Sequence, residues 1–206
     1  PQNILDACLK LKQAPKKIIL VSTSHVYGEQ GSEIIDENCL ANPINHYGCS
    51  KWAMEQIAKT YNDKLNIIIT RPFNYTGKGQ ADKFLIPKIV QHFKHKASSI
   101  QLGNIDIWRD FSDVSWIASV YVALLAEQIK SPQILNLCSQ RLISIREIID
   151  LLQKTVGYTI QVEVNPKFVR QADMQRQCGS NKALLELLPE LDRTVDIKET
   201  ILRMLQ

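Results

Sequence analysis

Residues 17–22 read Lys-Ile-Ile-Leu-Val-Ser, a continuous apolar run of the length of one β-strand. Residues 66–70, Asn-Ile-Ile-Ile-Thr, form a second such run, and a polar loop and a predicted helix over about residues 47–61 lie between the two. Continuous apolar strands joined by a crossover helix are typical of parallel sheets that are covered on both faces. The sequence therefore predicts an α/β fold built on a parallel sheet.

The remainder of the chain contains further periodic segments. Ser144 and Glu147 form a capping box, and we expect Asp113 to cap the helix that follows it. Further helices are predicted at about 4–11, 85–95, 113–125, 144–157, 180–189 and after Asp196, and further strands at 100–102, 134–138 and 160–164. The chain begins without methionine and enters an amphipathic helix at once, so we expect it to be an internal part of a longer protein.

The composition is that of an ordinary globular protein, with 45% hydrophobic and 22% charged residues. No run reaches the roughly 18 apolar residues of a membrane span, and the start lacks the pattern of a signal peptide. The net charge of +4 suits a phosphate-bearing substrate but is too dispersed to indicate nucleic-acid binding. Five scattered cysteines fit a reducing cytoplasm, and His92 and His95 lack a third ligand at helical spacing. We therefore expect a cytoplasmic protein with no metal, membrane or nucleic-acid partner.

Tyr47 and Lys51 are four residues apart at the start of a predicted helix, which places both side chains on one face. An ammonium group beside a tyrosine stabilises the phenolate and makes the side chain a better acid or base for carbonyl and hydroxyl groups. The pair by itself is more typical of a plain amphipathic helix than of a catalytic site. The hydroxyls of Ser22, Thr23 and Ser24 support the functional interpretation, because open α/β sheets bind ligands at the carboxyl ends of their strands.

Several short motifs follow one another in a fixed order. They are Ser-Thr-Ser-His-Val-Tyr-Gly at 22–28, Tyr-Gly-Cys-Ser-Lys at 47–51, Arg-Pro-Phe-Asn at 71–74, Gly-Lys-Gly-Gln at 77–80, Leu-Gly-Asn at 102–104 and Arg-Asp-Phe-Ser-Asp-Val at 109–114. In these motifs the chain resembles the extended short-chain dehydrogenase/reductases, also called the NAD-dependent epimerase/dehydratase family. It looks most similar to the GDP-4-keto-6-deoxy-D-mannose reductases, which deliver hydride to C4 of the sugar.

The resemblance implies a Rossmann-like parallel sheet with a smaller α/β substrate-binding lobe. Residues 1–75 would be the C-terminal half of the NAD(P)-binding domain, and residues 76–206 mainly the substrate lobe, with about 113–157 returning to the sheet. The family's glycine-rich phosphate loop and roughly a hundred preceding residues are absent from this chain. We therefore expect an incomplete site for NADP or NAD and no catalysis by these 206 residues alone.

The resemblance also implies residue roles. Thr23 would hydrogen-bond the C4 oxygen, Tyr47 would be the acid/base, and Lys51 would bind the nicotinamide ribose. The implied cofactor contacts are Ser22, Tyr47, Lys51, Pro72 and Phe73, and the implied substrate contacts are Thr23, Ser24, His25, Asn74, Lys88, Arg109 and Arg170.

Two of the implied substrate contacts are arginines, which suit the oxygens of a diphosphate. For Arg109 an ion pair with Asp106 or Asp110 is the alternative. Arg170 is followed by Gln171, where the family has proline. For Lys88 a solvated lysine is an equal alternative.

Ser24 and His25 occupy positions where 4,6-dehydratases have an acidic residue after the catalytic threonine, which argues against dehydration. The predicted function is NAD(P)-dependent reduction of the C4 keto group of a GDP-4-keto-6-deoxy-hexose. A 4-epimerase of the UDP-glucose 4-epimerase type, a 4,6-dehydratase and a non-catalytic nucleotide-sugar-binding relative remain as alternatives. The family commonly dimerises through the helix that carries Tyr47 and Lys51, so a homodimer is expected, although the sequence is equally compatible with an internal role for this helix.

Overall fold

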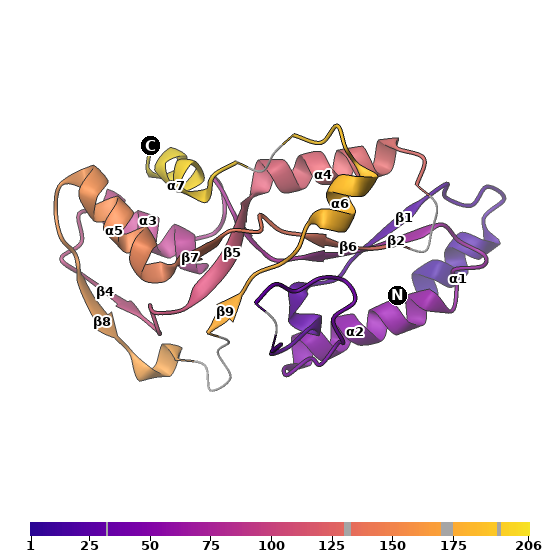
Figure 1. Cartoon of the computed structure of the whole chain (residues 1–206), viewed down its shortest axis with the longest axis horizontal. Coiled ribbons are helices and arrows are strands. Elements are labelled where there is room, and N and C mark those ends of the chain that lie inside the picture. Colours follow the sequence, from indigo (N-terminus) through magenta and orange to yellow (C-terminus); the bar gives the residue numbers. More distant parts are fainter. Residues whose placement is uncertain (32, 130–132, 170–174, 193–194) are drawn as a thin grey trace. The chain divides into compact units, whose positions relative to one another are not determined.

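The computed structural model describes residues 1–31, 33–129, 133–169, 175–192 and 195–206 (Figure 1). The chain forms two compact units, and each is assembled from segments that are far apart in the sequence. Unit 1 comprises Pro1–Phe73, Ser119–Cys138 and Gly179–Leu191. Unit 2 comprises Asn74–Ala118, Ser139–Cys178 and Asp192–Gln206.

Unit 1 contains a three-stranded parallel sheet in the order β1-β2-β6. Its strands are β1 (Ile18–Val21), β2 (Ile67–Pro72) and β6 (Gln133–Leu137). The helix α2 (His46–Lys59) forms the connection between β1 and β2. This arrangement confirms the predicted α/β fold with a parallel sheet.

The helices of unit 1 pack on this sheet through apolar side chains. The helix α1 (Gln2–Lys10) and α2 contribute Leu5 and Ala58 to a cluster with Ile67 and Ile69 of β2. The helix α4 (Val114–Ala126) enters unit 1 at Ser119, and its Tyr121 hydroxyl lies 3.1 Å from Oγ1 of Thr70. The helix α6 (Lys182–Leu187) contacts β6.

One strand of this sheet is less buried than its sequence predicts. Every residue of β2 is buried, whereas residues of β1 are half-buried and Val21 is exposed. In the part of the chain that the structure describes, β1 pairs with β2 alone. An edge strand has a neighbour on one side only, and its side chains are less covered for that reason.

Unit 2 has its apolar core between three helices and several short strands. Its helices are α3 (Leu85–Lys94), α5 (Ile145–Val156) and α7 (Ile197–Leu205). The strand β5 (Trp108–Asp113) pairs with three others, and a separate parallel pair completes the unit. The partners of β5 are β3 (Asn74–Thr76), β7 (Leu142–Ser144) and β9 (Arg176–Gln177), and the separate pair is β4 (Ser99–Leu102) with β8 (Gln161–Val164).

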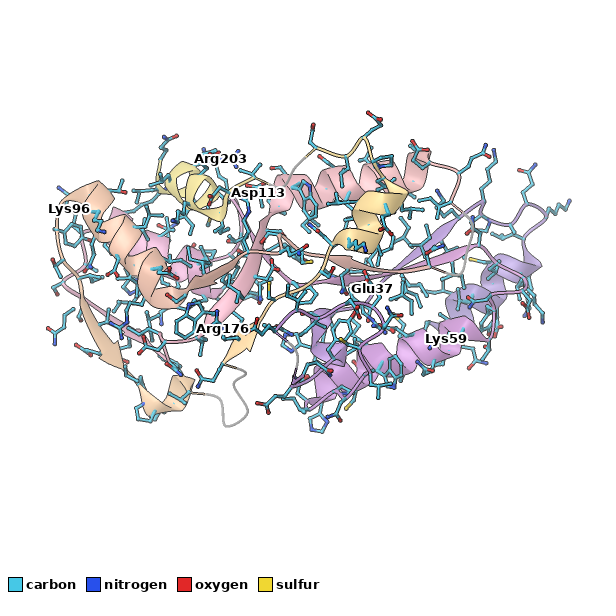
Figure 2. The ribbon with its side chains drawn as sticks, viewed as in Figure 1. Glu37, Lys59, Lys96, Asp113, Arg176 and Arg203 are labelled. Atoms are coloured by element: carbon cyan, nitrogen blue, oxygen red, sulfur yellow. The ribbon has the colours of Figure 1, made fainter. Side chains whose placement is uncertain are left out.

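Two predicted caps are present in unit 2. Ser144 and Glu147 form the capping box of α5, and Gly157 ends this helix with the positive φ that favours glycine. Asp113 accepts a hydrogen bond from the backbone N–H of Ser115 at 2.7 Å at the start of α4. Its second oxygen accepts from Arg203 of α7 at 2.8 Å (Figure 2).

The units differ in extent from the segments that the sequence suggests. The predicted return to the sheet at about 113–157 includes α5, but α5 lies in unit 2, because its apolar face packs against α3 and α7. Gly179–Leu191 belongs to unit 1, which the sequence did not indicate. The short strands β3, β5, β7 and β9 were also not predicted.

Among the described helices, none has the length and apolar character needed to cross a membrane. In the same residues no group of three or more histidine, cysteine or acidic side chains could hold a metal ion.

Candidate active site

Tyr47 and Lys51 lie together at the carboxyl end of β1. Asn45 caps α2 by accepting a hydrogen bond from the backbone N–H of Gly48 at 2.8 Å. Lys51 Nζ donates to the backbone carbonyl of Val21 at 2.7 Å and lies 5.8 Å from the centroid of the Tyr47 ring. Tyr47 is 51% exposed, so a ligand can reach it. The structure therefore places an ammonium group beside a solvent-accessible tyrosine.

Thr23 and Tyr47 are linked through His25. The short helix η1 (Ser24–Val26) follows β1, and the backbone N–H of His25 donates to Oγ1 of the buried Thr23 at 3.3 Å. The rings of His25 and Tyr47 meet edge to face with centroids 5.8 Å apart. Gly48 makes this approach possible, because a Cβ atom there would lie 2.7 Å from the carbonyl oxygen of His25.

Ser22 is buried, and its hydroxyl donates to Glu55 of α2 at 2.5 Å. The Glu55 carboxylate also forms an ion pair with Arg71 of β2, with atoms 2.6 Å apart. The sequence motifs indicate no role for Glu55 or Arg71. A glutamate four residues after Lys51, on the same helix face, was the available signal.

Pro72 and Phe73 lie where β2 ends beside β6. Pro72 is paired with Leu137, and the N–H of Phe73 donates to the carbonyl of Leu137 at 2.9 Å. Phe73 is buried in a cluster with Tyr27, and their ring centroids are 6.3 Å apart. The predicted cofactor contacts of these two residues stay predictions.

A buried polar network holds the loop after η1 against the end of β6. Tyr27 donates its hydroxyl to Asn136 Oδ1 at 2.6 Å, and Asn136 Nδ2 donates to the carbonyl of Ile35 at 3.1 Å. The backbone N–H of Asn136 donates to Glu37 at 2.7 Å. Burial raises the pKa of Tyr27 to about 12, so its hydroxyl remains protonated and can donate.

Glu37 offers a test of this network (Figure 2). The pKa of Glu37 is raised above its ordinary value. Burial is the main cause, and it outweighs the opposing effect of the hydrogen bond from the backbone N–H of Asn136. The folded state therefore holds the proton more tightly than the unfolded state, and the free energy of unfolding falls as pH rises through the interval between the two pKa values. The Glu37→Gln variant keeps an acceptor without the charge. We expect it to be more stable than the wild type above this interval, by less than about 1 kcal/mol.

Urea denaturation at about pH 7 and about pH 4 measures this difference, since an ordinary glutamate is largely ionised only at the higher value. The advantage of Glu37→Gln should be present at the higher pH and shrink at the lower one. An advantage that grows as the pH falls would contradict the assignment.

Asn74 and Arg109 belong to unit 2. Asn74 Nδ2 donates to the backbone carbonyl of Asp110 at 3.3 Å, and β3 and β5 are paired at this point. Arg109 Nη1 donates to the backbone carbonyl of Trp108 at 2.9 Å. Both oxygens of Asp106, one of the two alternative partners of Arg109, accept hydrogen bonds from Arg146.

Lys88 lies in the same unit on α3. Its Nζ donates to the backbone carbonyl of Gln101 at 2.6 Å and lies 4.7 Å from the centroid of the half-exposed Phe168 ring. The guanidinium of Arg176 of β9 lies 5.3 Å from the centroid of the Trp108 ring in a second such contact, which no sequence motif indicates; Figure 2 labels Arg176. Both contacts join segments that are far apart in the sequence, so no local sequence pattern predicts them. Arg170 lies outside the described residues.

Comparisons with known proteins identify relatives along nearly the whole chain. The family model described as GDP-mannose 4,6 dehydratase matches residues 1–204. The chain is 33% identical to the GDP-6-deoxy-D-talose 4-dehydrogenase of Aggregatibacter actinomycetemcomitans over 91% of its length. It is 30% identical to the GDP-6-deoxy-D-mannose reductase of Pseudomonas aeruginosa over 88% of its length. It spans 63% and 62% of these two relatives, which is less than two thirds of their length.

The structure of the chain is similar to a solved relative as well. RMD from Pseudomonas aeruginosa, complexed with NADPH, is 27% identical with a TM-score of 0.82, and the match covers 92% of this chain and 65% of that one. These matches confirm the family that the motifs indicated. The chain belongs to the GDP-mannose 4,6 dehydratase family, within the extended short-chain dehydrogenase/reductases.

Proposed function

We propose that the protein containing this chain is an NAD(P)-dependent nucleotide-sugar oxidoreductase that acts at C4 of a GDP-6-deoxy-hexose. The favoured reaction is reduction of the C4 keto group. One observation supports this function above all. The accessible Tyr47 lies between contacts with Lys51 and His25 at the carboxyl end of β1, and the buried Thr23 precedes His25 by two residues. The relatives named above act on GDP-6-deoxy sugars as a 4-dehydrogenase and a reductase.

The residues of this site fit a nicotinamide nucleotide, either NADP or NAD. Lys51 offers an ammonium group and Tyr47 a hydroxyl, which are the donors that a ribose requires. Pro72 and Phe73 would contribute from the adjacent end of β2, where Phe73 is fixed by its hydrogen bond to Leu137. The bound nucleotide would supply the hydride for C4.

Three side chains would take part in proton transfer to the C4 oxygen of the sugar. Tyr47 would transfer its hydroxyl proton to this oxygen as the carbonyl becomes an alcohol, and solvent would return a proton to the phenolate. The positive charge of Lys51 would stabilise the phenolate. The hydroxyl of Thr23 would hydrogen-bond the same oxygen and hold the carbonyl in place.

The remaining predicted contacts would bind the rest of the substrate. Ser24 and His25 follow Thr23 directly and would contact the sugar. No carboxylate occupies these two positions, which supports reduction over dehydration. Asn74, Lys88, Arg109 and Arg170 would contact the nucleoside diphosphate, for which guanidinium and ammonium groups are suited.

We also propose the organisation of the whole protein. Residues 1–75 would complete a dinucleotide-binding domain together with a segment outside this chain. The coverage of the relatives supports this organisation, as does the edge of β1 that pairs with no strand among the described residues. Residues 76–206 would mainly form the substrate lobe. The protein would be a cytoplasmic homodimer through α2, whose Trp52 and Ile57 are only half-buried.

The full-length protein provides the test. It is to be supplied with GDP-4-keto-6-deoxy-mannose and NADPH or NADH, and the oxidation of the nucleotide followed by absorbance. We expect turnover by the full-length protein and none by the 206-residue chain alone. Interconversion of UDP-glucose and UDP-galactose without net use of the nucleotide would instead identify a 4-epimerase. Binding of nucleotide sugars without any turnover would identify a non-catalytic relative.

A further inference from the structure

The buried face of α2 contains a carboxylate that the proposed reaction does not use. Glu55 has 0% exposure and lies four residues after Lys51 and eight after Tyr47, so the three share one side of the helix. A glutamate is almost never fully buried unless it is paired. Its position behind the two catalytic side chains therefore requires an explanation.

The carboxylate joins α2 to two neighbouring strands at the same level. Glu55 Oε1 accepts from Ser22 Oγ at 2.5 Å and from Arg71 Nε at 3.0 Å, and Oε2 accepts from Arg71 Nη2 at 2.6 Å. Ser22 and Arg71 are adjacent, because the backbone N–H of Ser22 donates to the carbonyl of Thr70 at 2.7 Å. One carboxylate thus contacts the ends of both β1 and β2.

The second link between α2 and β1 involves Lys51. It donates to the carbonyl of Val21, and Ser22, the next residue, donates to Glu55. Val21, the last residue of β1, and Ser22, which follows it, are therefore bound by side chains that are one helical turn apart on α2. A shift of the helix along the strand would break both hydrogen bonds at once.

Arg71 leaves this carboxylate little freedom to move. Its side chain is 3% exposed, and its guanidinium carbon lies 4.7 Å from the centroid of the Tyr27 ring and 5.8 Å from that of Trp52. Burial alone lowers the pKa of Arg71, but interactions with Glu55 and Tyr27 outweigh this effect and raise it. The arginine therefore remains charged beside two aromatic rings.

Buried ion pairs contribute little net stability compared with apolar residues of similar volume, but a pair with fixed partners restricts the geometry around it. We infer that Glu55 is a positioning residue. Its bonds to Ser22 and Arg71 fix the middle of α2 at the ends of β1 and β2, one turn after Lys51, and so hold Lys51 on Val21 beside Tyr47. The catalytic consequence rests on the proposed function, whereas the geometric one does not.

Two variants separate positioning from stability in the full-length protein. The double variant Glu55→Met/Arg71→Met removes both charges and retains apolar volume, so it is expected to fold. Ser22→Ala leaves the ion pair in place and removes one hydrogen bond. The control is the same double replacement at Asp106 and Arg146, a pair with two similar hydrogen bonds that is more than half exposed.

The first readout needs no cofactor or substrate. Brief reductive methylation followed by mass spectrometry gives the labelling rate of Lys51 relative to the exposed Lys59 of the same helix (Figure 2). We expect this ratio to rise about fivefold in the Glu55/Arg71 double variant, the size associated with loss of one hydrogen bond. The Asp106/Arg146 control should leave it unchanged.

The second readout is turnover per folded molecule. The Glu55→Met/Arg71→Met variant is expected to have a kcat about 100-fold lower than the wild type, the size associated with a catalytic group misplaced by about 1 Å. The change in KM for the nucleotide sugar should be much smaller. A purely stabilising role predicts an unchanged labelling ratio and an unchanged kcat in the molecules that fold, and that result would overturn the inference.

The remaining outcomes are also decisive. If the double variant does not fold, Ser22→Ala decides: a higher Lys51 labelling ratio supports positioning, and an unchanged ratio overturns it. If the wild-type protein turns over no nucleotide sugar, the proposed function fails, and the labelling ratio still tests the role of Glu55.

Discussion

Replacing Tyr47 with phenylalanine in the full-length protein is expected to lower kcat about 10²–10⁴-fold, the usual contribution of a positioned acid or base. The substitution removes a single hydroxyl and keeps the ring that contacts His25 and Lys51. Because the side chain is 51% exposed, the thermal unfolding midpoint should hardly change. Steady-state kinetics with the C4-keto substrate, together with calorimetry, measure both quantities.

Tyr158→Phe is a matched control for this prediction. The Tyr158 hydroxyl contacts the backbone carbonyls of His92 and Phe93 at 3.4 and 3.3 Å in the core of unit 2. Its removal should leave kcat within about twofold of the wild type, as expected for loss of a weak hydrogen bond away from the reacting atoms. Unchanged turnover in Tyr47→Phe would show that another group protonates the C4 oxygen, and the assignment of Tyr47 would be wrong.

The sequence predicted the elements that have a local signal. The helix α5 has a capping box at Ser144 and a glycine at its end, and β2 is an apolar run that covers a complete strand. The strands β3, β7 and β9 have only two or three residues each, so their pairing with β5 depends on contacts that no local pattern encodes. The two units are likewise assembled from distant segments, which is why Gly179–Leu191 was not placed in unit 1.

The same distinction applies to the site. Tyr47 and Lys51 are four residues apart on one helix, so spacing alone puts them on one face. The partners of Glu55 are 33 and 16 residues away, and only folding brings Ser22 and Arg71 to it. The contact of Lys51 with Val21 spans 30 residues, so the spacing along the helix does not predict it.

The largest effect on stability is expected from Glu55→Ala, which should lower the free energy of unfolding by about 3–5 kcal/mol. The reason is that the substitution leaves the buried positive charge of Arg71 without its partner. Arg71 has a side chain only 3% exposed, and its Nη1 has no hydrogen-bond partner among the described residues even in the intact pair. Without Glu55, the arginine would lose the acceptors of its other two bonds and remain buried.

Asp106→Ala provides the matched comparison, because Asp106 also accepts two hydrogen bonds from one arginine, Arg146, at 2.7 and 2.9 Å. Its side chain and that of Arg146 are 58% and 55% exposed, so water replaces the lost partner and the expected loss of stability is small. Urea denaturation of both variants, at low and high salt, measures the difference. The effect of Asp106→Ala should shrink with salt, whereas that of Glu55→Ala should not, because buried charges are screened much less. Equal and small losses in the two variants would show that the interior adjusts to an unpaired Arg71, and the prediction for Glu55→Ala would be wrong.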